Sequence, residues 1–178
     1  MKGRSVVAMA VMAVLLAASV ASAAENKDTK KEGQTLAGVK VLCVVVEETS
    51  SDLIAAGVSQ ESLRTAVERR LRNADIQLAT DEQFGNTPGM PFLHVVVTAL
   101  PVKLGPSNAL GYAAYVRFSF NQPVRLARTP NLPTSAETWS LGKLVTTETM
   151  AELWGAVFDH TNSFTSAYTD ANPPKEER

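Results

Sequence analysis

The chain has 178 residues, of which 45% are hydrophobic and 20% are charged, and its formal net charge at pH 7 is −1. This composition is typical of a soluble globular protein and excludes a disordered or fibrous chain. Nucleic-acid binding requires a basic face, which the charge balance does not indicate, so no nucleic-acid partner is expected.

Residues 1–23 have the three parts of a secretory signal peptide. Two basic residues precede an uncharged apolar run (residues 6–18), and small residues follow at Ala21 and Ala23, where a peptidase would cut. An uncleaved membrane anchor is the alternative, because the 20 residues 5–24 carry no charge and could span a bilayer. The Ala-x-Ala ending favours cleavage, so we expect a periplasmic or secreted protein with no membrane span after cleavage.

Removal of the signal peptide deletes 2 of the 17 basic residues and no acidic residue, which leaves 15 basic against 18 acidic residues and a net charge of −3. Cys43 is the single cysteine, so no internal disulfide can form. Residues 24–37 are polar and without period, and they predict a flexible tether. A single packed domain is expected over residues 38–170, followed by a disordered tail at 171–178.

The first expected strand, residues 39–46, is apolar in both phases after its lysine. A β-branched run of this kind belongs in the middle of a sheet, covered on both faces. Cys43 lies within it and is therefore interpreted as a small core residue and not as a reactive thiol, which would need exposure and a positive neighbourhood.

A helix begins after Ser59, which can cap its free N–H groups, and Val58 and Leu63 have the spacing of a hydrophobic staple. Apolar positions at spacings of three and four predict its buried stripe: Leu63, Ala66, Val67, Leu71 and Ala74. Residues 68–72 contain three arginines, but Glu68 can pair with Arg64 and Arg72 at i,i+4, so this run predicts a solvated helix face and not an anion-binding patch.

The middle of the chain alternates short elements with loops. A short strand is expected at 76–78, a helical turn at 81–84 and a loop at 86–91. Alternation then predicts a strand at 92–100, and Gly and Pro predict a loop at 101–111.

The clearest pattern is one long strand from Tyr112 to Leu126, whose even positions are apolar, with Gln122 as the exception. A hairpin turn at residues 121–123 is the alternative, but it would reset the phase, which continues. Pro123 has no N–H to donate, so it predicts a sheet edge or a bulge. A turn at 129–133 and an antiparallel partner strand at 134–145 should follow.

A second helix is capped by Thr149, with Glu152 at capping-box spacing, and ends at Asn172. Its stripe contains Met150, Leu153, Val157, Thr161, Phe164 and Tyr168, widened by Trp154 and Phe158. Two helical stripes need one sheet face to cover them. The expected fold is therefore α+β: a two-layer sandwich of a four- to five-stranded, mostly antiparallel sheet with two helices on one face.

Catalytic and metal-binding patterns are missing from the sequence. The two histidines, His94 and His160, are far apart, and no G-x-S-x-G, H-E-x-x-H or C-x-x-C motif occurs. His160 stands beside Asp159 and is interpreted as a surface or boundary residue. We therefore expect no enzyme, no catalytic residue, no metal site and no cofactor.

The sheet face away from the helices is the expected binding surface. Its candidate residues are His94, Tyr115, Arg117 and Arg125, around an apolar centre expected from Leu42, Val44 and Val46. Loops, the C-terminal tail or a second copy could cover this face instead. The predicted function is an exported non-enzymatic module that binds a protein partner or itself; the alternatives are an envelope assembly or transport accessory that holds an apolar ligand, and a hydrolase with an unrecognised site.

The chain resembles a group of small signal-peptide-bearing bacterial envelope proteins of unassigned activity. The motifs that carry the resemblance are Gly57-Val58-Ser59-x-Glu61-x-Leu63, Val67-Glu68-x-Arg70-Leu71-Arg72-x-Ala74-x-Ile76, Thr138-Trp139-Ser140-x-Gly142, and Phe164, Ala167, Tyr168, Asn172 and Pro173. Asp75 departs from the pattern, which has Gly after the helix. The architecture is also similar to the N-terminal α+β domain of the Tol-system periplasmic propeller protein, which implies a bacterial source and a periplasmic address but transfers no site.

Overall fold

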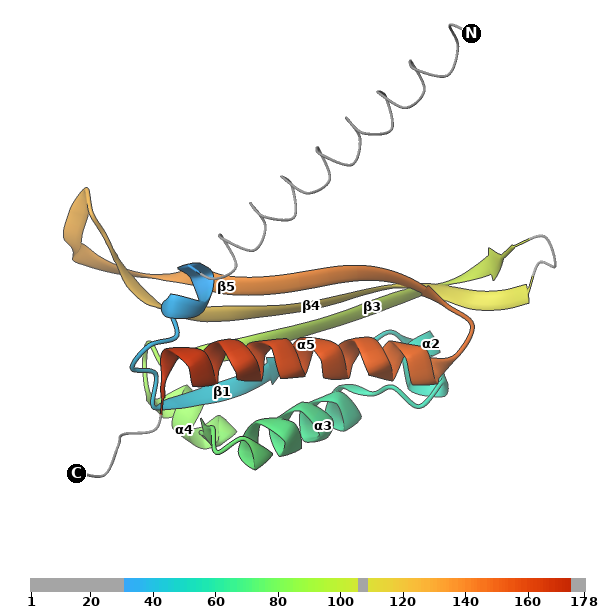
Figure 1. Cartoon of the computed structure of the whole chain (residues 1–178), viewed down its shortest axis with the longest axis horizontal. Helices are drawn as coiled ribbons and strands as arrows, with labels where there is room; N and C mark the ends of the chain where they lie inside the picture. Colours follow the sequence, from blue (N-terminus) through green and yellow to red (C-terminus); the bar gives the residue numbers. More distant parts are fainter. Residues whose placement is uncertain (1–30, 106–108, 174–178) are drawn as a thin grey trace, which may run out of the picture.

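The computed structural model describes residues 31–105 and 109–173 as a five-stranded sheet with helices along one face (Figure 1). The elements in chain order are β1 (Val41–Val46), α2 (Ser51–Ala55), α3 (Gln60–Asn73), β2 (Gln77–Leu78), α4 (Asp81–Asn86), β3 (Phe92–Leu104), β4 (Ala109–Leu126), β5 (Thr129–Thr147) and α5 (Met150–Ala171).

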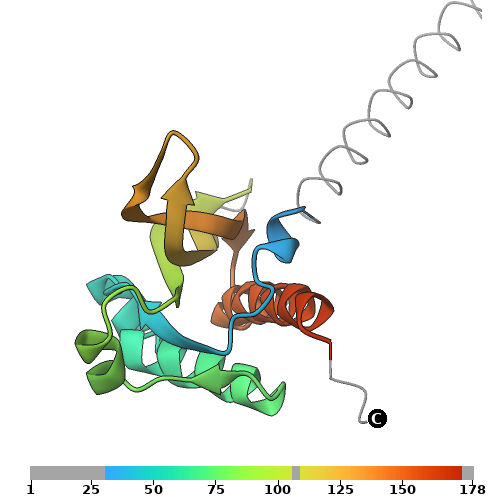
Figure 2. The same ribbon diagram turned by 90° about the vertical axis from the view of Figure 1, so that its left-hand side faces the viewer.

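The strands have the spatial order β2-β1-β3-β4-β5. β1 runs parallel to β2 and β3, whereas β3, β4 and β5 form an antiparallel meander. Figure 2 shows α3 and α5 next to each other on one side of this sheet. The expected two-layer α+β sandwich is therefore confirmed, and we call the sheet face away from α3 and α5 the open face.

β1 lies inside the sheet, as expected, but its alternate side chains face the opposite sides of the sheet from those predicted. Val44 and Val46 are in register with Leu93 and Val95 of β3, and all four side chains belong to the core beneath the helices, together with Leu42. The expectation that the even positions of β1 form the centre of the open face is wrong. Both phases are apolar, so the sequence alone does not distinguish them, and the pairing with β3 decides.

Cys43 is in the opposite phase of β1 and is nevertheless only 2% exposed. It is in register with Phe92, whose ring meets Phe84 of α4 edge to face at 5.6 Å between centroids. α4 therefore covers this corner of the open face. Burial raises the pKa of the Cys43 thiol, which confirms the interpretation as a core residue.

α3 begins and ends where the sequence indicates. The Ser59 hydroxyl accepts a hydrogen bond from the Ser62 N–H at 3.1 Å, and the Ser59 N–H donates to the Ser62 hydroxyl at 2.9 Å. The helix ends at Asn73, and Asp75 follows with φ +59°. This left-handed conformation explains why a glycine is expected there, because only glycine adopts it without cost.

β4 is one continuous strand, which confirms the long-strand prediction. Its pairing with β3 ends at Asn121, and a bulge interrupts its pairing with β5 between Phe120 and Asn121. Pro123 therefore lies just past a bulge, where β4 pairs with β5 and no longer with β3, which suits its missing N–H. The β4–β5 hairpin extends past one end of α5 and the β3–β4 hairpin past the other (Figure 1).

Two expected connections are wrong. The predicted loop at 101–111 contains the end of β3 and the start of β4, with Pro101 paired to Tyr112, and the predicted turn at 129–133 lies inside β5. β1 pairs with β3 only as far as Val95, so among the strands of the described chain the later part of β3 has β4 alone as a neighbour. Proline is tolerated on such a one-sided strand, and the cross-strand pairing overrides the local turn signals.

The expected tether also needs correction, because residues 31–37 pack against the domain. Leu36 is 0% exposed and belongs to the core. The Thr35 hydroxyl donates to the Thr138 carbonyl at 3.1 Å, and the Gln122 amide donates to the Thr35 carbonyl at 2.9 Å. The segment crosses β5 in Figure 1. The rest of the tether and the signal peptide lie outside the described residues.

The C-terminal end of α5 closes over the same segment. Asn172, which the sequence assigned to a disordered tail, donates to the Leu36 carbonyl at 3.0 Å and accepts from the Gly38 N–H at 2.8 Å. Tyr168 donates to the Val39 carbonyl at 2.7 Å. Residues 174–178 of the expected tail are outside the described part of the chain.

Candidate functional site

The open face brings together three of the four predicted binding residues. His94 on β3 opposes Ser119 on β4, and Arg117 and Tyr115 follow along β4 at every second position, so all three point to the same side. Arg125 lies apart from them, on the β4–β5 hairpin past the bulge, where its guanidinium donates to a backbone carbonyl at 3.1 Å.

Two basic residues of this group are already paired within the protein. The Arg117 guanidinium contacts the Glu137 carboxylate at 2.7 Å, and the His94 Nε2 lies 2.8 Å from Glu47. Exposed pairs of this kind contribute at most about 1 kcal/mol each to stability. The main consequence of the Arg117–Glu137 pair is electrostatic, because it offers a partner both signs of charge and little net charge.

Between these pairs and the far end of the sheet, the open face carries exposed apolar side chains. Leu100 is 65% exposed, Tyr115 41% and Leu144 72%. Tyr115 is directly opposite Leu144, while Leu100 opposes Ala113, the next open-face position on β4. We call Leu100, Tyr115 and Leu144 the open-face patch. Grouped exposed apolar residues are typical of interaction surfaces.

Tyr115 also has a structural role within the sheet. A Cβ atom placed on Gly142 of β5 would lie 2.6 Å from the Tyr115 hydroxyl oxygen, so the tyrosine lies across this glycine. An aromatic ring over a glycine on a neighbouring strand shields the exposed backbone. The glycine therefore fixes the orientation of the ring in the patch.

His160 is buried, contrary to the expectation of a surface or boundary residue. It is 3% exposed, its Nδ1 lies 2.9 Å from the Ala156 carbonyl, and its ring packs on Phe118 at 5.6 Å between centroids. Helical spacing places it on the same side of α5 as Phe164, four residues later. This spacing predicts its burial correctly, whereas the charged neighbour Asp159 suggested a surface position. Its Nε2 has no hydrogen-bond partner among the described residues.

This burial predicts a pH-dependent stability. Desolvation lowers the pKa of His160 below its ordinary value of 6.5; Lys143 on β5 lowers it further, whereas the Ala156 carbonyl and Asp159 oppose the shift. The unfolded chain then binds the proton more readily, so the contribution of His160 is complete above pH 6.5 and is lost as the pH falls below it. Urea unfolding at pH 7.5, 6.5, 5.5 and 4.5 measures this loss.

The matched control is His160→Leu, which removes the titrating group and keeps an apolar side chain in the core. Its stability should fall less steeply than that of the wild type between pH 6.5 and 4.5, because the buried imidazole that disfavours protonation in the folded state is gone. Parallel profiles for the two proteins would contradict the role of His160.

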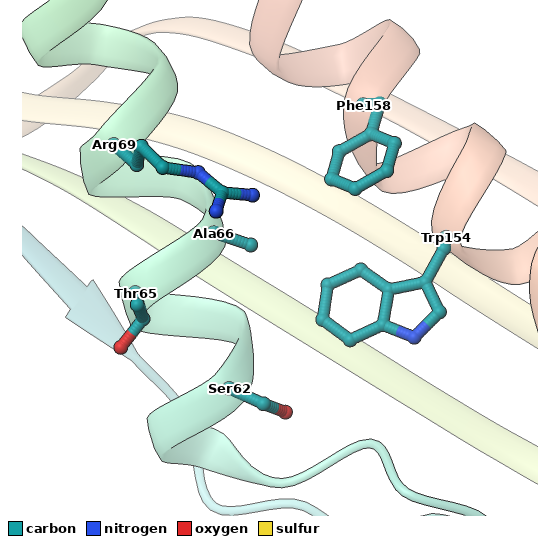
Figure 3. Close-up of a pocket in the computed structure, with 6 residues that line it drawn as sticks. All are labelled: Ser62, Thr65, Ala66, Arg69, Trp154 and Phe158. Atoms are coloured by element: carbon teal, nitrogen blue, oxygen red, sulfur yellow. The ribbon is translucent and has the colours of Figure 1, made fainter.

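A second feature was not predicted from the sequence: a groove of about 380 Å³ between α3 and α5. Figure 3 shows its lining residues, which are Ser62, Thr65, Ala66 and Arg69 from α3 and Trp154 and Phe158 from α5. Helical periodicity predicts the two aromatic residues as part of a widened buried stripe. This stripe is wider than packing of α5 on the sheet requires, and that excess width is the sequence feature that could have indicated the groove.

The described residues contain no group of three or more His, Cys, Asp and Glu side chains that could hold a metal ion. Within the same residues, no helix is both long enough and apolar enough to cross a membrane.

Comparison with known proteins gives matches to solved structures alone, because no family model and no curated protein matches the chain. The PelC dodecamer of Paraburkholderia phytofirmans is 18% identical over 74% of this chain and 88% of that one, with a TM-score of 0.42. A minor lipoprotein of Acinetobacter baumannii (13%, covering 80% and 99%, TM-score 0.32) and the rare lipoprotein B of Shewanella oneidensis (15%, covering 71% and 89%, TM-score 0.22) are also similar.

Bacterial lipoproteins are thus among the structural neighbours. At these identities and TM-scores, no residue role is transferred from them. The resemblance to the Tol-system domain stays a prediction.

Proposed function

We propose that this protein is an exported, non-enzymatic module that binds a protein partner of the bacterial envelope through the open-face patch. The observation that supports this function is the grouping of Leu100, Tyr115 and Leu144 on adjoining positions of three neighbouring strands, on the face that α3 and α5 leave uncovered. The signal peptide expected at residues 1–23 supports export to the bacterial envelope.

The chemistry of the surface defines the kind of partner. Protein interfaces commonly have an apolar centre with a polar rim. Here the rim carries the Arg117–Glu137 ion pair, which has little net charge, and the His94–Glu47 contact. The fitting partner is therefore a protein surface with an apolar centre and little net charge, and binding should depend weakly on salt.

Site-specific photo-crosslinking in the organism that expresses the protein tests the proposal. A photoreactive side chain at position 144 should give a discrete adduct with another envelope protein. The matched control is position 54, because Ile54 is also an exposed apolar residue, at 53%, but lies on α2 outside the patch. Absence of an adduct at 144, or the same adducts at both positions, would contradict the proposed surface, and an adduct of twice the chain mass would identify a second copy instead.

Once the adduct is identified, Leu144→Asp measures the energy of the contact. A carboxylate in the centre of an interface would have to be desolvated without a partner. The affinity should fall at least about tenfold, which corresponds to about 1.4 kcal/mol, since truncation of a hot-spot residue near the centre of an interface costs at least about 2 kcal/mol. Ile54→Asp should leave the affinity unchanged.

A further inference from the structure

We propose that the groove between α3 and α5 is a binding site for a small aromatic carboxylate, independent of the open-face patch. The groove lies on the helix layer and its lining comes from α3 and α5, whereas the patch lies on the strands of the opposite face.

The apolar part of the groove is a continuous aromatic wall. Trp154 and Phe158 are one helical turn apart on α5, and their ring centroids are 5.6 Å apart with an interplanar angle of 31°. Ala66 lines the α3 side, where a small side chain leaves the space between the helices open (Figure 3). Flat aromatic walls favour stacking with a planar, aromatic ligand.

The charged part of the groove is cationic. Arg69 lines it, and the guanidinium of Arg70 lies over the Phe158 ring, 3.8 Å from its centroid. The other two arginines of α3 are paired, Arg64 with Asp81 at 2.6 Å and Arg72 with Glu68 at 2.8 Å. In residues 31–105 and 109–173, neither Arg69 nor Arg70 has an ion-pair partner.

The acids of α3 do not line the groove. Glu61 and Glu68 are seven residues apart and share one side of the helix. Glu68 is two residues from Ala66, which corresponds to a rotation of about 200° at 3.6 residues per turn, and its carboxylate is paired with Arg72 at 2.8 Å. The expectation of a solvated face therefore holds for the Glu68–Arg72 pair, whereas Arg69 lines the groove.

A carboxylate is the anion that suits this arrangement. The planar guanidinium fork donates two parallel hydrogen bonds to a carboxylate, which gives orientation as well as affinity. The Ser62 hydroxyl is already engaged with Ser59 in the cap of α3, so the lining offers a ligand Arg69, Thr65 and the indole N–H of Trp154 as polar groups.

The dimensions favour a small molecule over a peptide helix. Ser62 and Arg69 are separated by seven residues, which corresponds to about 10 Å along the helix axis. A volume of about 380 Å³ is near the lower end of the range for small-molecule pockets, roughly 300–1,000 Å³. A ligand with one or two aromatic rings matches this length and volume, whereas a docked helix would extend past both ends.

Titration calorimetry of the purified protein with 2-naphthoate tests the proposal, with neutral 2-naphthamide as the matched ligand. The wild type should bind the carboxylate more tightly than the amide. In Arg69→Gln the affinity for 2-naphthoate should fall at least about tenfold, because a hydrogen bond to a charged group is lost, while the affinity for the amide should not change. Arg64→Gln should bind both ligands as the wild type does, because Arg64 is rotated by about 140° from Arg69 around α3 and its guanidinium is paired with Asp81.

Two results would overturn the proposal: no binding of 2-naphthoate at millimolar concentration, or equal affinities in the wild type and Arg69→Gln. Trp154→Ala provides an independent variant, since it removes part of the aromatic wall. It should lower the affinity for 2-naphthoate and for 2-naphthamide alike. Circular dichroism of each variant verifies that it is folded. Because none of these variants alters the patch, failure here leaves the photo-crosslinking result at position 144 unaffected.

Discussion

Replacement of Leu36 by alanine is expected to lower the free energy of unfolding by about 2–5 kcal/mol, the range for a fully buried leucine. Leu36 is 0% exposed although it stands in a polar segment before the first strand. The loss combines the transfer free energy of the deleted methyl groups with the cavity that they leave. Urea unfolding followed by far-UV circular dichroism measures it directly.

The control is Gln34→Ala, because Gln34 is exposed two residues earlier in the same segment. Its stability should stay within about 0.5 kcal/mol of the wild type, as for most surface substitutions. If Leu36→Ala and Gln34→Ala had equally small effects, residues 31–37 would behave as the tether that composition alone suggests.

The sequence predicted the fold class and the long strand for a clear physical reason. Alternation over Tyr112–Leu126 is visible because the even positions of β4 are buried under the helices from Ala114 to Phe120 and half-buried beyond them. The phase of β1 could not be predicted in this way, because its alternate positions are apolar on both sides, and only the register with β3 assigns them. The hydrophobic period of a strand or helix therefore shows which side is buried only where its two sides differ in burial.

Local turn chemistry failed where tertiary pairing was stronger. Residues 101–111 contain Gly and Pro, yet most of them pair as β3 and β4 in an extended hairpin. Composition similarly missed Leu36, because one apolar residue among polar neighbours has no period of its own. Both errors arise from contacts between residues far apart in the sequence, which local propensity does not reflect.

The candidate sites likewise contain a part that the sequence predicts and a part that depends on tertiary packing. His94, Tyr115 and Arg117 could be placed on the open face from strand phase alone. The Arg117–Glu137 pair and the exposed Leu144 depend on β5, whose register a bulge shifts. The groove could not be predicted at all. It exists because α3 and α5 pack beside each other, and the sequence of each helix separately does not give that distance.

Replacement of Phe164 by alanine is expected to lower the free energy of unfolding by about 3–5 kcal/mol, the range for a large aromatic side chain that is fully buried. Phe164 is 0% exposed and lies at the centre of an aromatic cluster, 5.1 Å from Trp139 and 5.8 Å from Phe120 between ring centroids. Since domains of this kind are stable by only about 5–15 kcal/mol, the variant should melt at a much lower temperature. Thermal unfolding by circular dichroism measures this shift.

Phe158→Ala is the matched comparison, since it changes the same residue type on the same helix. Phe158 is half-buried and lines the groove, so its loss should cost about half as much stability, in proportion to the apolar area removed from contact. It should also weaken 2-naphthoate binding, which Phe164→Ala should leave intact at temperatures where that variant is folded. A larger loss of stability for Phe158→Ala than for Phe164→Ala would mean that the interhelical aromatics hold the fold together, and would remove the reason for treating the groove as a site.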